Sequence, residues 1–253
     1  MSKISVVGIG PGGLDEMTPC ARRAIESAEV VAGYNTYIKL IESLLGGKKI
    51  IGRAMMQEVE RCQLAVEETL AGNNVAVVSS GDSGVYGMAG LVVEMILDLP
   101  EDSRPQFEVV AGVSAVNAAS AILGAPLMND FAVISLSDLM TPWEFIKRRV
   151  RAAAEGDFVI ALYNPKSKRR VTQLDEVQKI LLEFREKNTP VGIVTNAGRD
   201  GETKIISTLE NFTREEVNMF SLVLIGNSQT FVKSGFMITP RGYQLNKEKN
   251  SCD

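Results

Sequence analysis

The sequence contains no histidine, and this absence excludes more chemistry than any other feature of its composition. Without imidazole there is no His general base and no Ser-His or Cys-His nucleophile pair, and most zinc and haem sites are excluded as well. Only three cysteines occur, Cys20, Cys62 and Cys252, and they are too scattered for a metal knuckle or a C-x-x-C redox pair. We therefore expect a protein of the reducing cytoplasm that requires no metal of its own.

Long hydrophobic runs and a surplus of basic residues are missing too. No apolar run approaches the roughly 20 residues that a membrane helix needs, and the start reaches glycines before a signal-peptide core could form. Lys and Arg number 27 against 31 Asp and Glu, a formal net charge of −4, which disfavours sequence-independent binding of nucleic acid. We expect neither a nucleic-acid nor a membrane partner.

What is present is an alternation of short apolar runs with helical patterns along the 253 residues, which is typical of an α/β fold. Strands are expected at 4–7, 30–32, 49–51, 74–79, 106–110, 131–135, 157–163, 190–195, 203–208 and 220–225. Helices are expected at 18–28, 37–45, 58–71, 86–97, 142–155 and 171–186, with a further small-residue helix ending at 123. In the helix 58–71, Val59, Leu64, Ala65 and Leu70 are expected to supply the apolar face.

We expect two α/β domains of nearly equal size, 1–113 and 114–245, followed by a polar, disordered tail at 246–253. The first sheet should be mainly parallel. The second should be mixed, because the turn from Ala197 to Gly201 is too short for a crossover helix and makes strands 190–195 and 203–208 antiparallel.

The first motif is the run Gly8-Ile9-Gly10-Pro11-Gly12-Gly13, which follows a strand. It satisfies G-x-G-x-x-G, the fingerprint of a nicotinamide dinucleotide site. However, the residues that favour a helix start, Thr18-Pro19, come after the glycine run and not within it. The strand 30–32 is also not followed by the acidic residue that binds the ribose. A tight turn that lets two backbones approach each other is the alternative interpretation.

Two more glycine-bearing loops follow strands. Ser79-Ser80-Gly81-Asp82-Ser83-Gly84-Val85-Tyr86-Gly87 comes after the strand 74–79, and Ala111-Gly112-Val113-Ser114-Ala115 comes after 106–110. Asp82 either places a carboxylate at the rim of a site or caps the following helix. Open α/β sheets bind ligands at the carboxyl ends of their strands, so the three loops could line one cleft.

Together the three motifs resemble those of the tetrapyrrole methylases, which are S-adenosylmethionine-dependent enzymes. The segments Leu162–Ser167 (LYNPKS), Thr195–Arg199 (TNAGR) and Gly124–Met128 (GAPLM) are similar to the precorrin-3B C17-methyltransferase branch of cobalamin biosynthesis. The resemblance runs from Ile4 to Tyr243. It implies two α/β domains with an active-site trough between them, a homodimer, and a tetrapyrrole substrate methylated at C17 with ring contraction.

The resemblance also implies a set of site residues. Contacts to S-adenosylmethionine are expected at Gly10, Pro11, Ser80, Gly81, Asp82, Val85, Tyr86, Ser114, Ala115, Tyr163, Asn164 and Ala197. Catalytic roles are expected for Asp82, Asn129 and Asp130. Lys166, Arg170 and Arg199 are expected to bind the substrate, because a corrinoid precursor carries several carboxylates and needs cations.

One position departs from the pattern of that branch. A histidine is expected just before Asp130, and this chain has Asn129. An amide cannot shuttle a proton near neutral pH, so a ring-contraction step that relies on the histidine is in question here.

Alternative functions remain open at this point. They are a tetrapyrrole methylase for another ring position, a methylase of the same fold for ribosomal RNA or a protein side chain, a nicotinamide-dependent oxidoreductase, and a non-enzymatic corrinoid-binding protein.

Overall fold

A computed structural model gives the structure of the protein and describes residues 2–53 and 57–243. The predicted tail at 246–253 lies outside these residues. The chain divides into two compact units. The first comprises Met1–Ala118 together with Asn196–Glu202, and the second comprises Ala119–Thr195 together with Thr203–Asp253.

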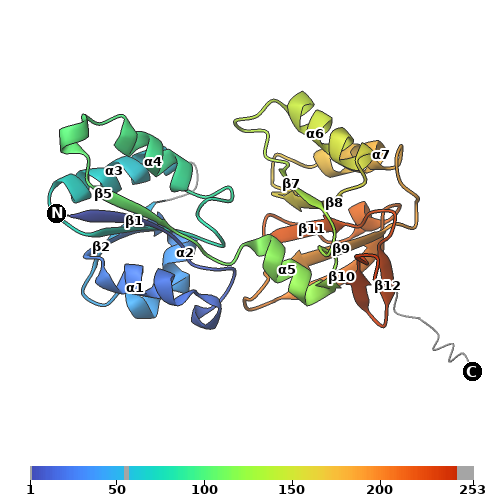
Figure 1. Ribbon diagram of the computed structural model, residues 1–253, viewed down its shortest axis with the longest axis horizontal. Helices are drawn as coiled ribbons and strands as arrows, with labels where there is room; N and C mark the ends of the chain where they lie inside the picture. Colours follow the sequence, from blue (N-terminus) through green and yellow to red (C-terminus); the bar gives the residue numbers. More distant parts are fainter. Residues whose placement is uncertain (1, 54–56, 244–253) are drawn as a thin grey trace, which may run out of the picture. The chain divides into compact units, whose positions relative to one another are not determined.

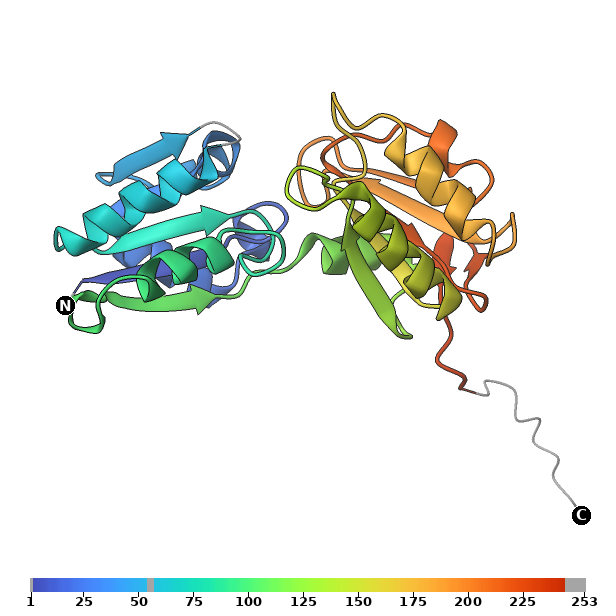
Figure 2. The ribbon, with the colours of Figure 1, turned by 90° about the horizontal axis from the view of Figure 1, so that it is seen from above.

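The first unit is built on a five-stranded sheet of order β3-β2-β4-β1-β5 whose strand pairs are all parallel. The strands are β1 (Lys3–Gly8), β2 (Val30–Tyr34), β3 (Lys49–Arg53), β4 (Val75–Ser79) and β5 (Gln106–Val110). Helices α1 (Pro19–Ser27) and α2 (Asn35–Leu40) cover one face, and α3 (Glu58–Leu70) and α4 (Ala89–Leu97) cover the other (Figures 1 and 2). Short 3₁₀ turns lie at Leu14–Glu16, Glu42–Leu44 and Glu101–Ser103. The prediction of a mainly parallel first sheet is confirmed.

Both faces of this sheet are apolar because alternate residues of each strand point to opposite sides. In β1, Ile4 and Val6 pack with the cluster under α3 and α4, whereas Val7 packs with the cluster under α1 and α2. This explains why the strands are continuous apolar runs, as expected for a parallel sheet covered on both faces.

The apolar face expected for α3 is half right: Ala65 is buried and Leu64 packs against the same cluster, but Val59 and Leu70 do not lie on the buried side. Val59 and Leu70 are 53% and 49% exposed, and the buried side chains of the helix are those of Arg61, Cys62, Ala65, Val66 and Thr69. The buried stripe therefore follows i, i+3, i+4 and i+7 spacing from Cys62, and it includes a charged residue, Arg61.

The second unit is built on a five-stranded sheet of order β10-β9-β11-β8-β7. Its strands are β7 (Phe131–Ser135), β8 (Val159–Tyr163), β9 (Pro190–Thr195), β10 (Thr203–Thr208) and β11 (Ser221–Ile225). Only β7 and β8 pair in parallel, and β9 and β10 are antiparallel, so the predicted mixed sheet is confirmed.

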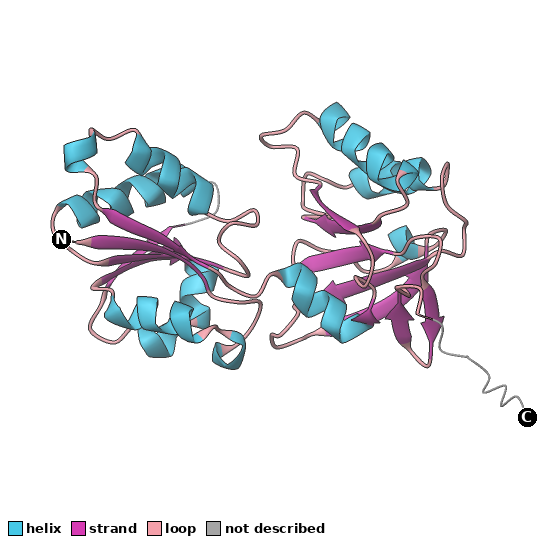
Figure 3. Cartoon of the chain, viewed as in Figure 1, coloured by secondary structure: helices cyan, strands magenta, loops and turns pink. Residues whose placement is uncertain are grey.

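Helices cover both faces of this sheet as well (Figure 3). Helices α6 (Trp143–Glu155) and α7 (Gln173–Leu181), with a 3₁₀ turn at Phe212–Arg214, pack on one face. The helix α5 (Ala115–Leu123) places Leu123 on the other, where a Cβ at Gly192 of β9 would lie 2.5 Å from the Leu123 side chain. A small sheet of β12 (Phe231–Lys233), β13 (Phe236–Ile238) and β6 (Gly124–Ala125) completes the unit.

Candidate active site

The carboxyl ends of β4, β1 and β5 lie side by side at one edge of the first sheet. After β1 the chain continues into α1 on one face, whereas after β4 it continues into α4 on the other face (Figure 1). In open α/β sheets, the point where neighbouring connections diverge to opposite faces is where ligands bind. The first two glycine motifs are the loops at this point.

These two loops are joined backbone to backbone. Gly10 N donates a hydrogen bond to Gly81 O at 3.0 Å, and Gly81 N donates to Gly10 O at 2.8 Å. Ile9 N donates to Ser79 O at 2.9 Å. These hydrogen bonds hold Pro11 and Ser80 beside each other at the carboxyl ends of β1 and β4.

The third loop reaches the same place because it contains glycine. A Cβ at Gly112 would lie 2.2 Å from Gly81 O and 2.6 Å from Gly8 C, distances that no side chain tolerates. The tight-turn interpretation of the first motif applies to Gly8, where a Cβ would lie 2.7 Å from both Gly112 N and Gly81 O, so Gly8 and Gly112 both serve the close approach of the three backbones.

The carboxylate of Asp82 ties two of these loops together. Its Oδ1 accepts a hydrogen bond from Gly84 N at 2.8 Å, within its own loop. Its Oδ2 accepts one from Gly112 N at 3.0 Å, in the third loop. Both oxygens of Asp82 are thus engaged by backbone N–H groups, which fixes the shape of the loop edge.

The end of the second loop is exposed and strained. Val85 and Tyr86 are 37% and 53% exposed, and Tyr86 has a φ of 55°, in the left-handed region. A bulky residue rarely adopts this conformation, and such strain concentrates at functional sites. Asn164 and Asn196, which lie in two other motif segments, share this conformation with φ of 51° and 54°.

Arg199 joins the T-N-A-G-R segment to the first two loops. Its Nε donates to Pro11 O at 2.6 Å, and its Nη2 donates to Ser80 Oγ. Burial lowers the pKa of Arg199 from its ordinary value, and the nearby Tyr37 phenol opposes that effect. In the same contact, a Cβ at Gly12 would lie 1.8 Å from Gly198 O.

The first unit therefore contains most of the predicted cofactor residues, and Ser114 and Ala115 stand at the start of α5. The predicted residues in this unit are Gly10, Pro11, Ser80, Gly81, Asp82, Val85, Tyr86, Ser114, Ala115, Ala197 and Arg199.

The nicotinamide interpretation of the first motif lacks its supporting geometry. Helix α1 begins only at Pro19, where Thr18 Oγ1 caps it by accepting a hydrogen bond from Ala21 N at 3.1 Å. β2 ends at Tyr34 and continues directly into α2 without a carboxylate. A dinucleotide site needs the helix N-terminus at the glycine run and an acidic residue after the second strand.

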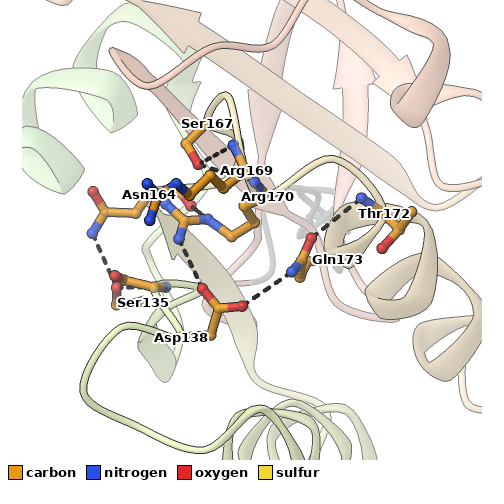
Figure 4. Close-up of polar contacts among 9 residues, drawn as sticks. Ser135, Asp138, Asn164, Ser167, Arg169, Arg170, Thr172 and Gln173 are labelled. Carbon is orange, nitrogen blue, oxygen red and sulfur yellow. Dashed lines mark hydrogen bonds and ion pairs between the residues drawn. The ribbon is translucent and has the colours of Figure 1, made fainter.

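In the second unit, the carboxyl ends of β7 and β8 carry a polar cluster (Figure 4). Asn164 Nδ2 donates to Ser135 Oγ at 3.0 Å. Arg170 is only 6% exposed, and its Nε donates to Asn164 O at 2.9 Å. Its Nη1 lies 3.3 Å from Asp138 Oδ1 in an ion pair, and Gln173 Nε2 donates to Asp138 Oδ2 at 3.1 Å. Arg170 thus binds groups of the protein itself and shapes the loop that carries Asn164.

The neighbouring cations are different. Lys166 is half-buried, and Lys168 and Arg169 are exposed. Within the described residues none of the three forms an ion pair, so no carboxylate in this part of the chain compensates their charges.

Asn129 and Asp130 lie elsewhere in the second unit. They precede β7, and Asn129 Oδ1 accepts a hydrogen bond from Asp130 N at 2.8 Å. Because β7 and β8 are parallel, the Asn164 cluster lies at the opposite end of β7, roughly 17 Å along the strand from Asp130 to Ser135. The structure does not bring the predicted pair Asn129 and Asp130 to Asn164.

Sequence reasoning missed Arg61, Tyr37 and Met88. The side chain of Arg61 is 3% exposed, and its Nη2 contacts Met88 Sδ at 3.4 Å. Burial raises the pKa of Tyr37, while the cations Arg199 and Arg61 oppose that effect. The signal that could have identified Arg61 is a charged residue at a position on the buried side of α3. The expected apolar face of this helix was partly wrong, so that position was not recognised as buried.

No helix in the described ranges is long and apolar enough to cross a membrane. Among those same residues, no group of three or more Cys, Asp or Glu side chains is arranged to hold a metal ion.

Comparison with known proteins decides the family. The model of the Tetrapyrrole (Corrin/Porphyrin) Methylases matches residues 3–213. The chain belongs to the tetrapyrrole methylases. This confirms the resemblance seen in the glycine motifs.

Relatives of this methylase share its sequence over nearly its whole length. It is 48% identical to the cobalt-factor III methyltransferase of Priestia megaterium over 99% of this chain, but it spans only 47% of that relative. It is also 48% identical to the probable cobalt-factor III C(17)-methyltransferase of Salmonella typhimurium, over 96% of this chain and 100% of the relative. The precorrin-3B C(17)-methyltransferase of a Sinorhizobium species is 37% identical over 94% of this chain and 96% of the relative.

Solved structures share the fold. The methyltransferase CobJ superposes with a TM-score of 0.88 at 33% identity, covering 95% of this chain and 100% of that one. A uroporphyrin-III C-methyl transferase from Thermus thermophilus, complexed with S-adenyl homocysteine, has a TM-score of 0.69 at 23% identity, over 89% of this chain and 92% of its own. The predicted α/β tetrapyrrole methylase fold is confirmed.

Proposed function

We propose that this methylase transfers a methyl group from S-adenosylmethionine to C17 of a precorrin-3-level tetrapyrrole, with the associated ring contraction, in cobalamin biosynthesis. One observation carries the proposal: the 48% identity that runs the full length of a relative named as a C(17)-methyltransferase. The Y-N-P-K-S and T-N-A-G-R segments, which distinguish this branch in the sequence, support it.

We propose further that the substrate already carries cobalt. Relatives named for cobalt-factor III are 41–48% identical to this chain. The Sinorhizobium relative named for precorrin-3B, the metal-free counterpart, is 37% identical. The cobalt belongs to the substrate and is not a ligand of the protein.

The first unit fits S-adenosylmethionine by the chemistry of the groups it presents. The exposed apolar side chains of Val85 and Tyr86 suit a flat adenine ring, and the hydroxyl of Ser80 suits a polar edge. We propose that the cofactor is held by the predicted residues of this unit. Asp82 would shape that site through its two backbone partners.

The bound cofactor supplies an electrophilic methyl group on a sulfonium. Displacement of that methyl by a ring carbon needs no nucleophile from the protein, so what the protein contributes is positioning. Small residues and backbone groups at the three loops bind and orient the donor. This agrees with a chain that contains no histidine.

The uncompensated cations of the Lys166 segment suit the carboxylates of a tetrapyrrole. Lys166, Lys168 and Arg169 form no ion pair with the described residues. We assign them to substrate binding and assign Arg170 and Arg199, whose guanidinium groups bind the chain itself, to positioning of the loops.

We also propose that the protein is a soluble, cytoplasmic homodimer, as the family resemblance implies. Light scattering coupled to size-exclusion chromatography checks the dimer, and a single species at the mass of one chain contradicts it.

The test of the cofactor is calorimetric. The purified protein is titrated with S-adenosylhomocysteine and, separately, with NAD. Binding of S-adenosylhomocysteine alone is expected, and binding of NAD alone would overturn the proposed function. Cofactor binding without transfer of a labelled methyl group to the tetrapyrrole would contradict the enzymatic part.

A further inference from the structure

Arg61 is a buried cation to which the described part of the chain gives no oxygen partner. Its side chain is 3% exposed, and neither Nε nor Nη1 has a hydrogen-bond partner. The third nitrogen, Nη2, reaches only the thioether sulfur of Met88, at 3.4 Å. A thioether is a weak acceptor and does not replace a carboxylate or carbonyl.

The other buried arginines among the described residues show what such a group normally finds. Arg170 binds the Asp138 carboxylate and the Asn164 carbonyl. Arg185 donates to the carbonyl oxygens of Gly226 and Phe158. Removing a charge from water without such partners is costly, so the position of Arg61 needs a reason other than stability.

That reason is suggested by what surrounds Arg61. Met88 directly follows the second glycine loop, and its backbone N donates to Ser79 Oγ at 3.2 Å. Tyr37 lies within electrostatic range of both Arg61 and Arg199. Arg199 in turn binds Pro11 and Ser80, at the centre of the proposed cofactor site. Arg61 is therefore a second cation at the same edge of the first sheet.

We propose that Arg61 binds a carboxylate of a ligand, which replaces the Met88 thioether as the partner of the guanidinium. Met88 is only half-buried and its side chain has several rotatable bonds, so it can move aside at low cost. A planar guanidinium matches a carboxylate with two parallel hydrogen bonds, and displacement of Met88 frees Nη2 to form such a pair together with the unpartnered Nε or Nη1.

This assignment rests on the proposed function, which offers two sources of the carboxylate. One is the amino-acid end of S-adenosylmethionine, and the other is an acetate or propionate side chain of the tetrapyrrole. The experiment distinguishes the two sources.

The variants are Arg61→Met, which keeps an unbranched flexible side chain and removes the charge, and Arg61→Lys, which keeps the charge and loses the planar fork. Arg22→Met is the matched control, because Arg22 is an exposed arginine of the same unit paired only with Glu26. Each protein is titrated with S-adenosylhomocysteine and with 5′-methylthioadenosine, which shares its adenosine and thioether but has no carboxylate. The KM for the tetrapyrrole is measured in parallel.

If the cofactor carboxylate is the ligand, Arg61→Met weakens S-adenosylhomocysteine binding roughly 10- to 100-fold and leaves 5′-methylthioadenosine unchanged. If a tetrapyrrole carboxylate is the ligand, cofactor binding is unchanged and the KM for the tetrapyrrole rises by a similar factor. In either case Arg61→Lys recovers part of the loss and Arg22→Met has no effect. Unchanged binding of all three compounds, or equal weakening of both nucleosides, would overturn the proposal.

The Tm of the ligand-free proteins is a second readout that a purely structural role would move in the other direction. Replacing an unpartnered buried charge by an apolar side chain of similar volume should leave the Tm of Arg61→Met equal to or above that of the wild type. A clearly lower Tm would mean that Arg61 is structural. This readout needs no cofactor, so it stands even if the wild type fails to bind S-adenosylhomocysteine and the proposed function fails.

Discussion

Among single residues, Asp82 links two loops of the proposed cofactor site through its carboxylate. Its two oxygens accept hydrogen bonds from Gly84 N and Gly112 N, which belong to different loops. A carboxylate that binds two backbone N–H groups holds both loops in place, and such charge-assisted bonds are roughly twice as strong as neutral ones.

We therefore expect Asp82→Ala to weaken S-adenosylhomocysteine binding by roughly 10-fold or more, because both loops lose their common acceptor. Asp82→Asn keeps one acceptor oxygen and should lose less. Calorimetry measures both affinities, with Asp102→Ala, an exposed acidic residue of a 3₁₀ turn, as the control. Wild-type affinity in Asp82→Ala would mean that the loop does not bind the cofactor.

Cys62 gives a prediction about pH. Burial raises the pKa of its thiol from 9.0 to about 11, and the neighbouring Arg61 opposes this shift. Because the folded state holds the proton more tightly, the thiol contributes stability that is fully present below pH 9.0 and is lost as the pH rises through 11. A shift of this size corresponds to about 2–3 kcal/mol.

The measurement is the free energy of unfolding between these two pH values. In Cys62→Ala the decrease should be smaller by about 2 kcal/mol, whereas Cys20→Ala, which removes an exposed thiol, should follow the wild type. Parallel pH profiles for all three proteins would contradict the burial argument.

At the scale of elements, the loop after β8 depends on Arg170. Its guanidinium joins the Asn164 carbonyl to Asp138, which belongs to the loop after β7 (Figure 4). If Arg170 acts through its ion pair with Asp138, the effects of substituting the two residues on kcat should not add. If Arg170 touches the substrate directly, the two effects should add.

We expect Arg170→Met to lower kcat more than Asp138→Asn, because it also removes the bond to the Asn164 carbonyl, and the double variant to be little worse than Arg170→Met alone, because the ion pair is already lost. Lys166→Ala, which breaks no ion pair among the described residues, should chiefly raise the KM for the tetrapyrrole. Steady-state kinetics of the four variants measure these effects. Additive losses for Arg170 and Asp138 would mean that Arg170 contacts the substrate itself.

The elements that sequence reasoning located best are those with strong apolar runs and clear end signals. The strands at 106–110, 131–135, 190–195 and 203–208 have the predicted bounds, and Thr18 and Pro19 begin α1 as expected. The strands β6, β12 and β13 were not predicted, because two or three residues carry no periodic pattern.

Other misses have a local cause. Helix α4 begins at Ala89 and not at residue 86, because Tyr86 adopts a left-handed conformation that interrupts a helix. The buried face of α3 was misassigned because Val59 and Leu70 are apolar but exposed, while Arg61 is charged but buried. Only tertiary contacts show which of these side chains are buried, and for this reason the sequence did not indicate Arg61 as a functional residue.

At the scale of the whole molecule, the sequence predicted the α/β class and both kinds of sheet, because the pattern of strands and connections determines them. The glycine loops of the site were predicted from their positions after strands. The partners of Asp82, Arg170 and Arg199 were not, because they join segments far apart in the chain. Spacing along the sequence carries no information about such contacts.

Methyl transfer to C17 of a cobalt-containing tetrapyrrole can be followed by locating the transferred methyl group in the product. The purified protein is incubated with S-adenosylmethionine carrying an isotopically labelled methyl group and with cobalt-factor III or its metal-free counterpart, and NMR locates the label in the product. We expect a single labelled methyl at C17, formed faster from the cobalt-containing substrate. A label at another ring carbon, or no transfer by a protein that binds S-adenosylhomocysteine, would contradict this expectation.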